Sequence, residues 1–71
     1  MQEYIYTVIE HETGDTSYYW TFEKAKRRAR HKFDDIFDAE WSELREGQHG
    51  YWKGFIDGEF QLVFVEPKNI F

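Results

Sequence analysis

Carboxylates and histidines are the residues of this sequence with the widest chemical repertoire, and their spacing decides what they could do. The chain has fourteen acidic residues, three histidines and no cysteine. His11 and Glu12 with Asp15, or His31 with Asp35 one helical turn later, could supply metal ligands. No third nitrogen or sulfur ligand stands at a recognised spacing, and neither an H-E-x-x-H motif nor a calcium-loop pattern occurs. We therefore expect neither a metal nor another cofactor.

Catalysis has little support in the residue types present. Ser17 and Ser42 are the serines, neither stands in a nucleophile elbow, and no glycine-rich loop could cradle a phosphate. A chain of 71 residues also struggles to form the cavity of a small-molecule site. The sequence predicts a protein that is not an enzyme and has no catalytic residues, and that binds another macromolecule instead.

Basic side chains are concentrated in residues 24–32. This segment holds six of the nine basic residues and no acid, so the rest of the chain, with three basic and fourteen acidic residues, has a balance of −11. On a helical wheel, one arc holds Lys24, Arg27, Arg28, His31 and Lys32. The arc could contact an anion or a nucleic acid, or it could be a solvated helix face with pairs such as Arg30–Asp34. Positive charge near the start of a long helix opposes the helix dipole, which favours a functional reason for the arc.

Acidic side chains follow directly after the basic segment. They are Asp34, Asp35, Asp38, Glu40, Glu43 and Glu46. Carboxylates spaced along a helix can imitate a row of phosphates, as a DNA-mimicking inhibitor would need, and the alternative is a solvated helix end.

Hydrophobic periodicity and turn signals give the order of the elements. The expected elements are strands 3–10 and 16–21, a helix over 22–46, and strands 50–57 and 59–66. Thr21 is suited to cap the helix, whereas Glu40 interrupts its apolar stripe and favours a break near Asp38. Asp57-Gly58 between two apolar segments predicts a type I′ hairpin turn.

Two hairpins flanking a helix predict an α+β fold of ββαββ order: one domain, 1–71, whose four-stranded antiparallel sheet carries the long helix on one face. The turn register places Tyr51, Phe55, Phe60, Leu62 and Phe64 on one face of the last hairpin, and Trp52, Ile56, Val63 and Val65 on the other. One helix covers one face only. A partner, a second copy of the chain or the C-terminal tail should therefore cover the other face.

The apolar residues of the sequence predict neither a membrane span nor a signal peptide. No stretch approaches the ~20 apolar residues of a membrane span, and the first residues lack the basic and apolar regions of a signal peptide. We expect a protein that does not enter membranes and works in the cytoplasm, which is the host cytoplasm if a phage encodes it.

The first 30 residues carry a resemblance. The segment Tyr4-Ile5-Tyr6-Thr7-Val8-Ile9-Glu10-His11-Glu12, followed by Thr21-Phe22-Glu23-Lys24-Ala25, resembles a group of small bacterial and phage domains. Those domains have a strand, a turn with His-Glu, a second strand and a helix entered through a Phe-x-x-(Glu)-Lys-Ala segment. In its small size, acidity, lack of cysteine and aromatic content the chain is similar to phage anti-defence proteins, including anti-CRISPR and anti-restriction inhibitors. That similarity implies an inhibitor and no catalytic residues.

These observations lead to one main hypothesis and two alternatives. The main hypothesis is a phage or mobile-element inhibitor that blocks a host defence complex, a protein or protein–nucleic-acid assembly, by occupying its surface. We expect its contacts to come from Tyr19 and Trp52 on the open sheet face and from Asp34, Asp35 and Asp38 on the helix. The alternatives are nucleic-acid binding through the basic arc and a structural homodimer that pairs through the open sheet face.

Overall fold

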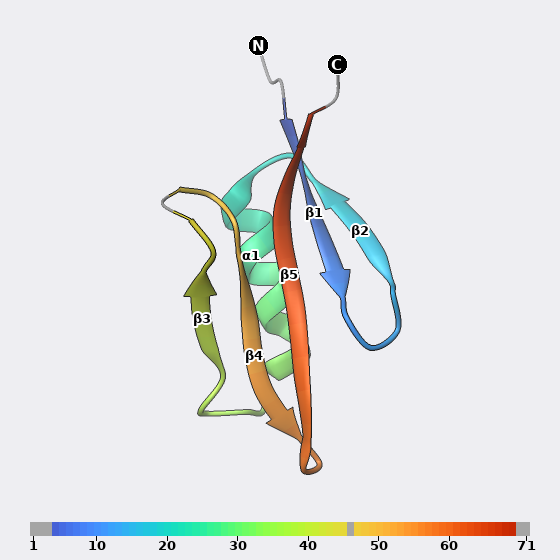
Figure 1. Ribbon diagram of the computed structural model, residues 1–71, viewed down its shortest axis with the longest axis vertical. Coiled ribbons are helices and arrows are strands. Elements are labelled where there is room, and N and C mark those ends of the chain that lie inside the picture. Colours follow the sequence, from blue (N-terminus) through green and yellow to red (C-terminus); the bar gives the residue numbers. More distant parts are fainter. Residues whose placement is uncertain (1–3, 46, 70–71) are drawn as a thin grey trace.

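The computed structural model describes residues 4–45 and 47–69, which form one α-helix and a five-stranded antiparallel sheet (Figure 1). The elements are β1 (Tyr4–Glu10), β2 (Thr16–Tyr19), α1 (Phe22–Arg30), the 3-10 helix η1 (His31–Phe33), β3 (Glu40–Glu43), β4 (Gly50–Ile56) and β5 (Glu59–Asn69). The strand order is β2-β1-β5-β4-β3, so the longest strand, β5, lies in the centre. The α+β class is confirmed, whereas the expected count of four strands is wrong.

The second hairpin forms as the turn signal predicts. Asp57 and Gly58 both have positive φ, at 53° and 82°, as a type I′ turn requires. Ile56 pairs with Glu59, and the register continues to Gly50 opposite Val65. The predicted division of this hairpin into two faces is therefore confirmed.

Strand β5 continues past the expected end at residue 66. Pro67 lies opposite Tyr6 of β1, and the ladder reaches Asn69. Strand β4 ends its pairing with β5 at Val65, so the last part of β5 has a β-strand neighbour on one side only. Proline is tolerated there because the side of β5 that has no neighbouring strand needs no backbone N–H donor. Residue 3, where the first strand was expected to begin, lies outside the described residues.

Helix α1 begins where predicted and ends far earlier. The Thr21 side chain accepts a hydrogen bond from the backbone N–H of Lys24 at 3.2 Å, as an N-cap does. The helix stops at Arg30 rather than near residue 46. The Arg30 guanidinium donates hydrogen bonds to the carbonyl oxygens of Phe33 and Ile36, and these bonds stabilise η1 and the turn that follows it. Phe37, an apolar residue within the expected helix 22–46, is fully exposed.

The chain after this turn forms the strand that the sequence did not predict. Strand β3 pairs with β4, with Trp41 opposite Trp52 and their rings 5.5 Å apart. A Cβ at Gly50 would lie 2.4 Å from the Ser42 carbonyl oxygen and 2.7 Å from the Trp41 ring. A glycine at this position is therefore what lets β3 approach β4 so closely.

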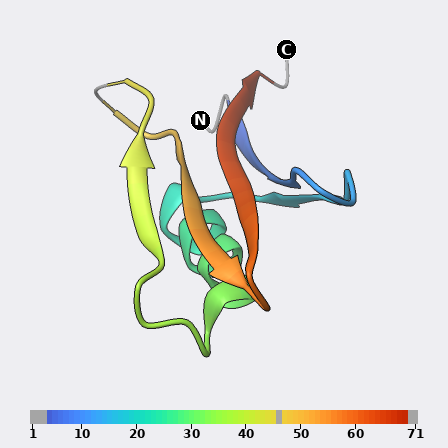
Figure 2. The ribbon, with the colours of Figure 1, turned by 60° about the horizontal axis from the view of Figure 1, so that its bottom comes forward.

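The core lies between α1 and one face of the sheet, as the two views of the ribbon show (Figures 1 and 2). Its buried apolar residues are Tyr6, Val8, Ala25, Ala29, Phe33, Val63 and Val65. The two alanines let the helix approach the sheet closely, and the fully buried Phe33 ring lies over Gly54. Among the described residues, no helix has the length and hydropathy needed to cross a bilayer.

Candidate functional site

The sheet face turned away from α1 carries aromatic and aliphatic side chains from four strands. We call it the uncovered face, and its apolar members are Ile5, Ile9, Tyr18, Tyr51, Phe55, Phe60, Leu62 and Phe64. The Tyr51 and Phe64 rings have centroids 5.5 Å apart, and so do those of Phe55 and Phe60. Phe55 and Phe60 remain 57% and 54% exposed. Exposed apolar patches are uncommon on monomeric soluble proteins, so this cluster is a candidate interaction surface.

Charged groups of both signs border these rings. Lys53 lies beside Glu40 on the neighbouring strand, with Nζ 3.7 Å from Oε2. Both residues line a shallow hollow of about 340 Å³ together with Asp38, Gly54, Phe55 and Phe60. The structure thus brings one predicted partner-binding residue, Asp38, next to the most exposed ring pair of the uncovered face.

Trp52 and Tyr19 do not lie on the uncovered face, and that part of the prediction is wrong. The Trp52 indole N–H donates to the carbonyl oxygen of Lys26 in α1 at 3.0 Å, so its ring packs under the helix. Tyr19 lies opposite Tyr6, whose side chain is buried on the helix side. The error arose because the sequence shows which residues share a face but not which face the helix covers.

The acidic residues also differ from the prediction in their placement. Asp34, Asp35 and Asp38 are exposed in the turns after η1, not along a helix, and Asp34 pairs with the His31 imidazole. Glu40 and Glu43 belong to β3, and residue 46 lies outside the described residues. A helical row of carboxylates that imitates phosphates is therefore not present among residues 34–45.

The early end of α1 also reverses the dipole argument for the basic residues. Arg27, Arg28 and Arg30 lie in the last turn of the helix, where positive charge is favourable. Only Lys24 remains near the helix start. The position of the charges along the helix is thus explained by stability, and a functional role must be argued from their surroundings.

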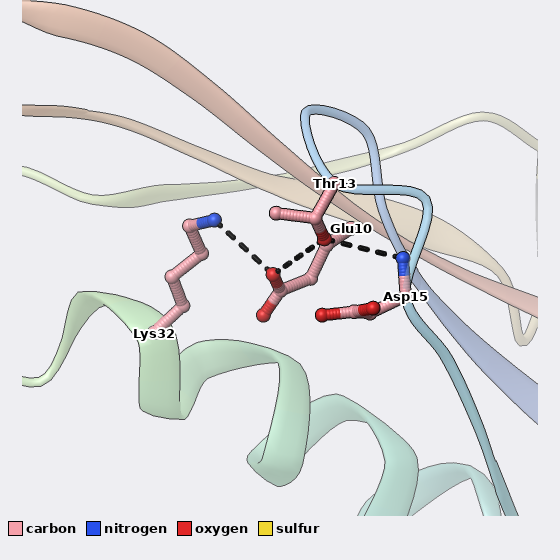
Figure 3. Close-up of polar contacts among 4 residues, drawn as sticks. All are labelled: Glu10, Thr13, Asp15 and Lys32. Atoms are coloured by element: carbon pink, nitrogen blue, oxygen red, sulfur yellow. Dashed lines mark hydrogen bonds and ion pairs between the residues drawn. The ribbon is translucent and has the colours of Figure 1, made fainter.

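Three of the six cations of residues 24–32 have structural contacts. Lys26 lies over the Trp41 ring, with Nζ 4.6 Å from its centroid, and Arg30 closes the end of the helix. Lys32 Nζ lies 3.3 Å from Glu10 Oε2, which also accepts a hydrogen bond from the Thr13 hydroxyl at 3.2 Å (Figure 3). This contact ties the end of the helical segment to the loop of the first hairpin.

The other three cations, Lys24, Arg27 and Arg28, make no side-chain hydrogen bond or ion pair within residues 4–45 and 47–69. They line a groove of about 410 Å³ between α1 and β2 together with Tyr19 and His31. We call this the basic groove. Four of the five residues predicted for an anion site thus meet in one groove, and Lys32 lies outside it.

A second cleft of about 370 Å³ adjoins the basic groove, because Arg28 and His31 line both. Its other polar lining includes Glu10, Asp15 and Lys32, so its charge is mixed. Within the described residues, no group of three histidine, aspartate or glutamate side chains is placed to hold a metal ion.

Comparison with known proteins gives no family for this chain: no family model, no curated protein and no solved structure matches it.

The residues that sequence reasoning missed are the ring pair Phe55–Phe60 as the exposed centre and Tyr19 as a wall of the basic groove. The Asp57-Gly58 turn already placed Phe55 and Phe60 directly opposite each other. No signal in the sequence places Tyr19 beside the helix.

Proposed function

We propose that this chain is a non-enzymatic protein-binding module that contacts its partner protein through the uncovered face. The observation that carries the proposal is that α1 covers one face of the sheet (Figure 2), while the other face exposes paired aromatic rings. Aromatic side chains surrounded by charged groups commonly contribute much of the binding energy at protein–protein interfaces.

The energetics favour the Phe55–Phe60 pair as the centre of the contact. Complete burial of a phenylalanine side chain contributes ~1.5–3 kcal/mol relative to full exposure. Both rings are already partly covered by each other and are a little over half exposed. A partner that covers them would gain about half that amount from each ring.

The charges around the rings favour a protein over a nucleic acid at this surface. Glu40 and Asp38 border the ring pair, and Glu66 lies farther along the same face of β5. Carboxylates here would repel phosphates, whereas Lys53 and Glu40 offer a partner protein charges of both signs. We expect a partner whose contact surface has an apolar centre and a basic part to its rim.

The narrower proposal concerns the identity of the partner. Small size, acidity, lack of cysteine and aromatic content make the chain similar to phage anti-defence proteins. We propose on that ground that it acts in a host cytoplasm as an inhibitor that occupies the surface of a defence complex.

The test is affinity capture from a nuclease-treated bacterial lysate with three tagged proteins. They are the unaltered chain, the double variant Phe55→Asp/Phe60→Asp, and Phe37→Asp as a control for an added charge on an exposed ring. We expect one stoichiometric protein to be retained by the first and third proteins and lost from the double variant. A defence nuclease or another subunit of such a complex would support the narrower proposal.

Two results would contradict the proposal. One is retention of every captured protein by the double variant when circular dichroism shows that it is folded. The other is a dimer in analytical ultracentrifugation that the double variant dissociates, because the uncovered face would then be a homodimer interface.

A further inference from the structure

The basic groove combines an aromatic wall with cations that form no ion pair among the described residues, in a protein that has an excess of acids. The chain contains fourteen acidic and nine basic residues. Even so, the groove lining holds Lys24, Arg27, Arg28 and His31 and, among the described residues, no carboxylate. The three long cations contact no acid elsewhere in the described chain, although Lys32 on the same segment does. Lys32 is thus paired, whereas Lys24, Arg27 and Arg28 form no ion pair among the described residues, although the helix end favours Arg27 and Arg28 and Glu23 lines a neighbouring hollow with Arg27.

The helical spacing of these residues places the three long cations of the groove in a line, with His31, the partner of Asp34, at its end. Lys24, Arg27, Arg28 and His31 follow the i, i+3, i+4, i+7 pattern, so they lie on one side of the helical segment, over about 10 Å of its length. Tyr19 of the edge strand β2 forms the opposite wall, with its ring partly exposed. Aromatic rings beside a basic groove are the usual elements of single-stranded nucleic-acid sites, where phosphates contact the cations and bases stack on the rings.

We propose that the basic groove binds a short stretch of single-stranded nucleic acid. Lys24, Arg27 and Arg28 contact its phosphates, and Tyr19 stacks on a base. This site is separate from the uncovered face and does not depend on the protein partner proposed there.

The surroundings of the groove limit the ligand to a short single strand. At one end the groove adjoins the cleft of mixed charge, where Asp15 and the Glu10–Lys32 pair interrupt the positive surface that further phosphates would need. A duplex keeps its bases stacked and paired, so it offers no free base to stack on Tyr19. An acidic peptide could satisfy the cations, but its carboxylate side chains have no aromatic face to stack on Tyr19 as a base does.

Fluorescence anisotropy with a labelled oligothymidine of about ten nucleotides tests the proposal. Binding at low salt should weaken as salt rises, with a slope of log K against log salt of about −2 for three phosphate contacts. In Arg27→Gln/Arg28→Gln the slope should fall to about −0.7, and the affinity should fall about tenfold or more. Tyr19→Leu should weaken binding about fivefold or more, whereas Tyr19→Phe, which keeps a ring, should not.

The matched control removes two positive charges elsewhere. Arg45→Gln/Lys53→Gln changes the net charge by the same amount and touches no residue of the groove. We expect this variant, and the uncovered-face variant Phe55→Asp/Phe60→Asp, to bind the oligonucleotide as the unaltered chain does. The two proposals therefore fail or succeed independently.

Three results would overturn the proposal. The first is no binding at low salt by the unaltered chain. The second is an equal loss of affinity in Arg45→Gln/Lys53→Gln, which would indicate a general charge effect or binding at the sheet face. The third is displacement of the oligonucleotide by poly-glutamate at equal charge concentration, which would make the ligand an acidic protein segment. Melting temperatures of all variants show which of them are folded.

Discussion

A methyl group added at position 54 should lower the stability of the protein, although alanine is normally the better strand residue. A Cβ on Gly54 would lie 3.1 Å and 3.2 Å from two atoms of the Phe33 ring, and 3.6 Å from the Cα of Ala39. Relief of glycine's backbone entropy would add about 0.5–1 kcal/mol of stability. Crowding in a packed core costs about 1–3 kcal/mol. Phe33 is 0% exposed, so its ring has no solvent-filled space into which to turn.

At this position the cost of crowding the core therefore exceeds the stability gained from glycine's lost backbone entropy. We expect Gly54→Ala to lower the free energy of unfolding by about 0.5–2 kcal/mol, the difference between the two contributions. In a domain of this size each kcal/mol corresponds to a fall in melting temperature of about 4–8 °C. Urea unfolding would measure the change through the midpoint, provided that the slope with denaturant stays the same.

A double-mutant cycle with Phe33→Leu separates the ring contact from other effects. Leucine leaves room beside position 54, so in that background Gly54→Ala should be neutral or stabilising by up to about 1 kcal/mol. The two substitutions should show a coupling energy of about 0.5–3 kcal/mol, as residues in contact do. An equal effect of Gly54→Ala in both backgrounds, or a rise in stability in the unaltered protein, would refute the packing of Phe33 on Gly54.

Three further predictions test other elements. Gly50→Ala would put a Cβ 2.4 Å from the Ser42 carbonyl oxygen, so we expect β3 to separate from β4, seen as faster amide hydrogen exchange in β3 while the other strands stay protected. Trp52→Phe removes the 3.0 Å hydrogen bond to the Lys26 carbonyl and should cost about 1 kcal/mol or more in urea unfolding; no change would mean that this bond adds nothing to stability. Thr21→Ala removes the N-cap and should cost about 0.5–2 kcal/mol, whereas Thr21→Ser should restore the stability; equal loss in both variants would argue against the cap.

Local chemistry in the sequence was enough to predict the elements whose causes are local. The Asp57-Gly58 turn follows from two residues that tolerate positive φ, and it sets the register that separates Phe55 and Phe60 from Val63 and Val65. The start of α1 follows from the hydroxyl of Thr21, which caps the first turn. Both signals act over a few residues, so no distant part of the chain is needed to interpret them.

The end of α1 and the existence of β3 depend on contacts between distant residues. The spacing of apolar residues after Phe33 fits a longer helix, but Arg30 binds two carbonyl oxygens beyond it and Phe37 is left in solvent. Strand β3 forms because β4 offers a free edge and Gly50 has no side chain to keep Trp41 away. Pairing of this kind overrides local helix preference.

The candidate sites show the same difference between what local sequence determines and what contacts between distant residues determine. The sequence by itself determined that one hairpin has two apolar faces and that residues 24–32 carry a block of positive charge. Only the tertiary structure decided which face remains uncovered, and it placed Trp52 and Tyr19 on the helix side. Only the tertiary structure paired Lys32 with an acidic side chain and placed Arg27 and Arg28 beside Tyr19 in a groove. The physical reason is that alternation along a strand or helix fixes which residues share a side, whereas the packing of α1 on the sheet fixes what each side meets.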